Sequence, residues 1–126
     1  LDLERVEKKV SLEKKEIVNQ LISQKYFCYM TGFIAGMPFM GNIDNSLKIE
    51  RLETPRVNVP KGSVGITEQF ANIYTFESPG GWNIIGNTPQ SIFDPGNKDN
   101  PILINPGDEV SFFQISKNEY EKLNEN

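Results

Sequence analysis

A mainly β fold with flanking helices is predicted by the way glycine and proline divide the chain of 126 residues. Residues 1–31 contain neither residue type, whereas all ten glycines and all eight prolines lie beyond them. The first part carries apolar residues at helical spacing, and the rest carries short apolar runs separated by turn-forming residues. Many short strands with such turns indicate a β-sandwich or a closed barrel.

Two short helices are expected in residues 1–24. Apolar residues recur there at the spacing of a helical face: Leu3, Val6, Val10, Ile17 and Leu21. Ser11 has the side chain of an N-cap, and Glu13 and Glu16 would complement the dipole of a helix that begins there. We therefore expect the second helix to start at Ser11 and both helices to pack against the rest of the chain.

The remaining residues, 25–126, are expected to hold the strands and a closing helix, in a single domain with the first part. The expected strands are residues 26–30, 56–59, 63–66, 72–76, 82–85, 102–104 and 109–115. The polar tail, residues 116–126, has Tyr120 and Leu123 at helical spacing and predicts the closing helix.

The composition argues against several classes of function. The net charge is −4 and no basic cluster is present, so we expect no nucleic-acid partner. No apolar run approaches the roughly 20 residues that span a bilayer, so we expect no membrane partner. Cys28 is the single cysteine, and we expect a small core residue in a chain that works in the reducing cytoplasm.

The missing residue types also limit the chemistry. The chain has no histidine, which removes Ser–His and Cys–His catalysis and histidine metal ligands. No pair of carboxylates stands out by its spacing as a catalytic dyad or a hard-cation site. The sequence therefore names no catalytic residue and no metal ligand.

Residues 78–89, Ser-Pro-Gly-Gly-Trp-Asn-Ile-Ile-Gly-Asn-Thr-Pro, form the most informative segment. Two adjacent glycines behind a proline permit turn conformations closed to other residues, and the bend presents Trp82. One interpretation is a ligand-site loop in which Trp82 stands beside short polar side chains. The other is a β-hairpin whose Trp82 fills the core. The residues alone leave both interpretations open.

Residues 32–41 form a second glycine-rich segment, in which large apolar side chains alternate with glycine and proline. Phe33, Met37 and Phe39 either bury themselves in a tight connection or line an apolar groove for a ligand or partner. No lysine follows the glycines as a phosphate-binding P-loop requires, so we do not expect nucleotide binding by this segment.

The order of the motifs along the chain carries a family resemblance. Ser78-Pro79-Gly80-Gly81-Trp82, followed by Gly86-x-Thr88-Pro89, is the most specific part of it. Further matching elements lie on both sides: Leu1 to Glu4, Ser11 to Gln20, Tyr29 to Phe33, Gly36, Pro38, Gly41, Asp44, Arg56-Val57, Val59-Pro60, Gly62 to Ile66, Ile73-Tyr74, Phe93 to Pro95 and Pro106 to Asp108. With these elements the chain resembles the allophanate hydrolase subunit 1 family, also called the carboxyltransferase C/D domain.

The resemblance implies a cyclophilin-like β-barrel flanked by helices. It also implies a smaller N-terminal domain before this one, and since the chain begins at Leu1 we expect a piece of a longer protein. Family members pair with a second subunit, like allophanate hydrolase subunit 2 or the C subunit of 5-oxoprolinase. In the 5-oxoprolinase branch the complex opens 5-oxoproline to glutamate with ATP, and in the amidolyase branch related domains transfer carboxyl from biotin to urea.

On this resemblance we expect an amide- or lactam-binding subunit nearest to the B subunit of 5-oxoprolinase, with ATP used by the whole complex and no cofactor bound by this domain. Large apolar side chains would line the groove: Phe33, Met37, Phe39, Tyr74 and Trp82. Short polar side chains would contact the ligand: Ser78, Asn87 and Thr88.

The chain departs from the family pattern at three loops. Phe70-Ala71 replaces a Gln-Thr pair, Asn87 replaces the arginine of Gly-Arg-Thr-Pro, and Ala35 to Pro38 replaces Pro-Gly-Phe-Pro. The lost arginine removes a cation suited to a carboxylate. These changes favour the alternative, a non-catalytic module like the Kip-type proteins, which bind and inhibit a sensor histidine kinase.

Overall fold

The computed structural model describes residues 2–32, 36–41, 43, 45–68, 70–90, 92–94, 96 and 101–124. The helices among these residues are α1 (Leu3–Val10), α2 (Lys14–Ser23), α3 (Lys117–Asn124) and the short 3₁₀ turn η1 (Asn45–Leu47). The strands are β1 (Tyr26–Thr31), β2 (Pro38–Gly41), β3 (Arg56–Val59), β4 (Ser63–Thr67), β5 (Phe70–Ile73), β6 (Ser78–Gly80), β7 (Asn83–Asn87) and β8 (Glu109–Val110).

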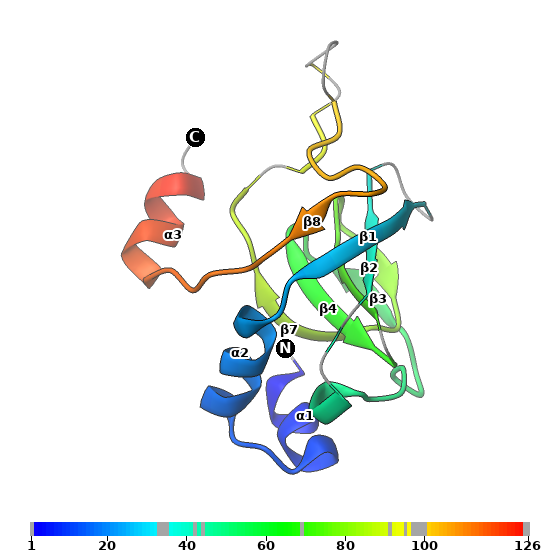
Figure 1. Ribbon diagram of the computed structural model, residues 1–126, viewed down its shortest axis with the longest axis vertical. Helices are drawn as coiled ribbons and strands as arrows, with labels where there is room; N and C mark the ends of the chain where they lie inside the picture. The colour runs from blue at the N-terminus through cyan, green and yellow to red at the C-terminus, as the bar shows by residue number, and fades with distance from the viewer. Residues whose placement is uncertain are drawn as a thin grey trace.

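Six strands form one antiparallel sheet in the order β7-β4-β5-β2-β1-β8, and β3 pairs with β6 in a separate two-stranded sheet. Helices α1 and α2 lie together at one end of the curved sheet, and α3 stands to its side (Figure 1). The mainly β class with flanking helices is thus confirmed.

The expected closure into a barrel is not found, because within the described residues the edge strands β7 and β8 do not pair with each other. Only two residues of β8 pair with β1, after which the chain leaves the sheet toward α3. The predicted strand at 109–115 therefore ends at Val110.

Alternation along the central strands divides the apolar side chains between the two faces of the sheet. On one face, Val64 and Ile66 of β4 join side chains of α1 and α2 in the main core, together with Cys28 of β1. A second, smaller cluster gathers the buried side chains Met37, Val59, Tyr74, Trp82 and Ile84. Burial of Cys28 confirms its expected place in the core.

The second helix does not begin at Ser11. Ser11 has a φ of 58° and ends α1 in the left-handed conformation. It is therefore the C-cap of α1 and not the N-cap of α2. Helix α2 starts at Lys14, whose backbone N–H donates to a carboxylate oxygen of Glu7 at 3.1 Å. A glutamate from the preceding helix thus supplies the acceptor that an N-cap side chain would otherwise provide.

Strand boundaries differ from the prediction where glycine or proline lies in the paired segment. The sequence predicts loops at β2 and β6, because each contains both residue types. The expected strand 72–76 is β5, shifted to Phe70–Ile73, and 102–104 contributes only an isolated bridge between Ile102 and Phe93. Proline at the start of β2 and in the two-stranded β3–β6 sheet fits its tolerance at strand ends and edges.

Asp2 fixes the start of α1 to the sheets. Its backbone N–H donates to the Ile84 carbonyl at 2.8 Å, and its carboxylate accepts the Ile84 N–H, also at 2.8 Å. The same carboxylate, which is almost fully buried, forms an ion pair with the guanidinium of Arg56 on β3. One side chain therefore joins α1, β7 and the two-stranded sheet.

We predict that Asp2→Ala lowers the free energy of unfolding by about 2–4 kcal/mol, because it leaves a buried N–H and a partly buried guanidinium without their acceptor. Urea denaturation measures the change. Glu4→Ala is the matched control, since that carboxylate lies in the same helix with its side chain 85% exposed, and it should change stability by less than about 1 kcal/mol. Equal losses in the two variants would contradict the role given to Asp2.

Candidate functional site

The apolar residues expected to line a site are brought together by the fold. Met37, Tyr74 and Trp82 belong to the second cluster, and the half-buried Phe39 packs against it with its ring centroid 5.8 Å from that of Trp82. Phe33 lies outside the described residues. Their burial favours the core interpretation of the Trp82 hairpin, and a role of these side chains in ligand binding stays a prediction.

The polar residues expected at the site lie elsewhere and bond to their own chain. Ser78, at the start of β6, donates from Oγ to the Phe76 carbonyl at 3.2 Å. Asn87 Nδ2 donates to the Lys61 carbonyl at 3.1 Å, and Thr88 Oγ1 accepts the Gln90 N–H at 3.2 Å. The hydroxyl of Tyr120, on α3, donates to Asn87 Oδ1 at 2.6 Å. The predicted residues thus divide into an apolar cluster and polar turns.

A shallow hollow of about 320 Å³ lies beside one of these polar residues. Its walls come from α1, the β3–β4 turn and β7: Leu3, Pro60, Ser63, Ile84, Ile85, Gly86 and Asn87. Asn87 is the one predicted polar site residue that lines it.

The Pro-Gly-Gly-Trp motif has a structural explanation in Tyr74. A Cβ atom at Gly80 would overlap the Tyr74 hydroxyl and lie 2.8 Å from its Cζ. Glycine therefore lets β6 approach the phenol ring closely, and the second cluster forms beneath the β3–β6 sheet. Trp82 follows two residues later and is 5% exposed.

The Tyr74 hydroxyl is the titratable group of the second cluster. Burial raises the pKa of Tyr74 above its ordinary value. The amide of Asn72, the backbone of Trp82 and the charge of Arg51 each lower the pKa of Tyr74 and so oppose that shift.

Two buried polar side chains, on β4 and β5, lack partners within the described part of the chain. Neither the amide nitrogen nor the amide oxygen of Asn72 is hydrogen-bonded, and the same holds for the Thr67 hydroxyl. Asn72 lies opposite Gly65 in the β4–β5 ladder, and its Oδ1 would be 2.9 Å from a Cβ at that position. A buried unpaired amide costs about 1–3 kcal/mol, so these groups invite a functional explanation.

Arg51 is the residue of this region that the sequence did not indicate. Its guanidinium carbon lies 5.9 Å from the centroid of the Trp82 ring. The segment 48–55 is polar and has no strand or helical period, so nothing in its pattern marks one side chain. Only the fold places this cation over the single tryptophan.

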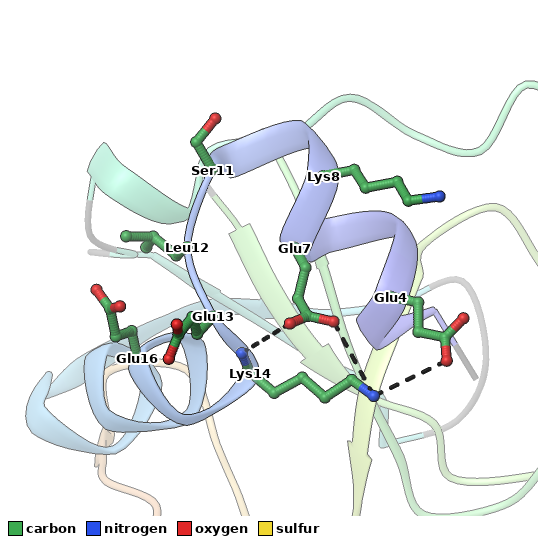
Figure 2. A pocket seen from close by; sticks show the side chains of 8 residues that line it. All are labelled: Glu4, Glu7, Lys8, Ser11, Leu12, Glu13, Lys14 and Glu16. Atoms are coloured by element: carbon green, nitrogen blue, oxygen red, sulfur yellow. Dashed lines mark hydrogen bonds and ion pairs between the residues drawn. The ribbon is translucent and has the colours of Figure 1, made fainter.

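Figure 2 shows a larger hollow, of about 640 Å³, between α1 and α2. Acidic and basic side chains line it: Glu4, Glu7, Lys8, Ser11, Leu12, Glu13, Lys14 and Glu16. Lys14 Nζ lies 3.8 Å from a carboxylate oxygen of Glu4 and 4.0 Å from one of Glu7. Because none of the predicted site residues lines this hollow and Lys14 pairs there with Glu4 and Glu7, we assign it to the helix junction.

Neither a metal site nor an activated thiol is found among the described residues. No cluster of three or more carboxylate, cysteine or histidine side chains is found among them that could hold a metal ion. Burial raises the pKa of the Cys28 thiol, which leaves it a weak nucleophile. None of the helices in the described ranges is long and apolar enough to cross a bilayer.

Comparison with known proteins gives a consistent result. A family model described as carboxyltransferase domain, subdomain C and D, matches residues 1–104. The chain is 37% identical to the B subunit of 5-oxoprolinase from Bacillus subtilis (strain 168), over 98% of this chain and 51% of that protein. It is 40% identical to the B subunit of 5-oxoprolinase from Escherichia coli O157:H7, over 88% of this chain and 50% of that protein.

A solved structure supports the same relationship. The crystal structure of a conserved protein of Pyrococcus horikoshii matches with a TM-score of 0.89 and 38% sequence identity, over 94% of this chain and 55% of that one. The chain thus spans about half the length of the curated relatives it matches.

We predict that the stability of the domain falls at high pH through Tyr74. A raised pKa in the folded state means that the stabilisation is present below pH about 10 and is lost as the pH rises further. Urea unfolding at pH 8 and pH 11 measures this loss, which should be smaller in Tyr74→Phe than in the wild type. The same loss in both proteins would show that the buried phenol does not ionise with a raised pKa.

Proposed function

Because the chain belongs to the family of carboxyltransferase domains, subdomains C and D, we propose that it is part of a subunit that acts in the ATP-dependent opening of 5-oxoproline. The observation that carries this proposal is the identity of 37–42% to proteins named as the B subunit of 5-oxoprolinase, over 88–98% of the chain. The resemblance of its motifs to this family is thereby confirmed, and the activity of the whole protein is our proposal.

In the proposed reaction, water adds across the C–N bond of the lactam and gives glutamate, and ATP hydrolysis supplies the driving force. This domain would contribute binding rather than proton transfer, because the chain has no histidine and no carboxylate is among the described residues of the second cluster. The names of the relatives imply a complex of several subunits. We propose a second family subunit as the partner, ATP bound outside this domain, and the cytoplasm as the compartment.

A protein-binding role is the second candidate, favoured by exposed apolar side chains on β1. Phe27, Tyr29 and Met30 are 40%, 54% and 53% exposed, and the rings of Phe27 and Tyr29 contact each other edge to face. Such a surface would suit a helical stem of a histidine kinase. Unchanged autophosphorylation of a copurifying kinase on addition of the protein would count against this role.

The test of the proposed function is reconstitution. The full protein and its partner subunit should together release glutamate from 5-oxoproline only when ATP is present, and each alone should be inactive. Glutamate is measured by an enzyme-coupled assay, with the pair lacking ATP as the control. An assembled pair that leaves 5-oxoproline intact in the presence of ATP would overturn the proposal.

A further inference from the structure

Arg51 carries a positive charge that no other group in the described part of the chain neutralises. Of the three arginines in the sequence, Arg5 donates from Nε to the Asn83 side chain at 3.0 Å, and Arg56 pairs with Asp2. The carboxylate of the adjacent Glu50 lies 3.2 Å from Lys9 Nζ instead. The Arg51 guanidinium lies over the Trp82 ring, and the residue is exposed to solvent.

The backbone holds this arginine in place from both sides. The carbonyl of Glu50 accepts a hydrogen bond from Asn83 Nδ2 at 2.9 Å, and the N–H of Leu52 donates to the Gly81 carbonyl at 2.8 Å. Both anchors flank Trp82 in the sequence. A cation whose position is fixed before a ligand arrives loses less conformational entropy when it binds one.

The unpaired amide of Asn72 lies beside the Trp82 side chain. A Cβ atom placed at Gly65 would lie 2.9 Å from Asn72 Oδ1 and 2.9 Å from Trp82 Cβ, so these two side chains are neighbours. The Asn72 amide is fully buried and lacks partners among the described residues.

We propose that Arg51 binds the carboxylate of a small lactam or amide acid. A guanidinium binds a carboxylate through two parallel hydrogen bonds, and an indole ring beside it offers an apolar surface to the ligand ring. The ligand class rests on the proposed function, for which 5-oxoproline is the probe. Arg51 is a binding residue in this proposal and takes no part in bond breaking.

The test compares two probes on the full protein together with its partner subunit. 5-Oxoproline carries a carboxylate on its lactam ring, whereas 2-pyrrolidinone has the same ring without it. Titration calorimetry gives the Kd of each probe for the wild type, Arg51→Gln and Lys48→Gln. Lys48→Gln is the matched control, since it removes an exposed cation three residues away.

Arg51→Gln should raise the Kd for 5-oxoproline by about tenfold to a hundredfold, the range expected for a lost hydrogen bond to a charged group. Lys48→Gln should leave that Kd within about twofold, and binding of 2-pyrrolidinone should be equal in all three proteins. In turnover, Arg51→Gln should raise KM far more than it changes kcat. Circular dichroism of each variant confirms that it is folded.

The outcomes separate the inference from the proposed function. Equal 5-oxoproline Kd values for Arg51→Gln and Lys48→Gln, in a complex that turns over, would overturn the inference alone. Arg51-dependent binding of 5-oxoproline without ATP-dependent turnover would support the inference and overturn the proposed reaction. No binding of 5-oxoproline to the wild type would overturn both.

Discussion

The buried amide of Asn83 is the constraint on which the rest of the structure depends. Its Nδ2 donates to the carbonyls of Glu50 and Ile66, at 2.9 and 3.1 Å, and its Oδ1 accepts from Arg5. One fully buried side chain thereby ties α1, β4 and the segment before β3 to the start of β7. Because its partners include three separate parts of the chain, loss of this amide would loosen the helix and the aromatic cluster together.

Two buried asparagines of the six-stranded sheet show the difference between structural and functional polar groups. Asn83 satisfies both of its donor hydrogens and one acceptor site, which is the usual condition of a buried amide. Asn72 lies two strands away with neither group paired within the described residues. The hydrogen bonds of Asn83 stabilise the fold, whereas the unpaired amide of Asn72 lowers its stability. Proteins commonly retain such a loss of stability at sites that bind a ligand.

The sequence predicted those parts of the fold whose periodicity is local. The helical faces of α1 and α2, the strands β1, β3 and β4 and the closing helix follow from apolar spacing and turn residues. The strands β2 and β6 were not predicted, because Pro38 and Gly80 are residue types that indicate turns. Their places in the sheets depend instead on contacts with other parts of the chain, such as that of Gly80 with Tyr74. The open edge of the large sheet also depends on long-range pairing, which short-range pattern does not encode.

The sequence likewise indicated only some residues of the candidate site, because the others are placed by long-range contacts. Met37, Phe39, Tyr74 and Trp82 were expected together and do meet in one cluster, although buried more deeply than a groove would require. Arg51 was missed because the hydrogen bonds that flank it, from Asn83 Nδ2 to the Glu50 carbonyl and from the Leu52 N–H to the Gly81 carbonyl, join residues far apart in the sequence.

A crystal structure of the full protein soaked with 5-oxoproline tests the central claim most directly. The account predicts the ligand carboxylate within hydrogen-bond distance of the Arg51 guanidinium, with its ring beside Trp82. Ligand density at another site, with Arg51 still lying free over the indole, would contradict it.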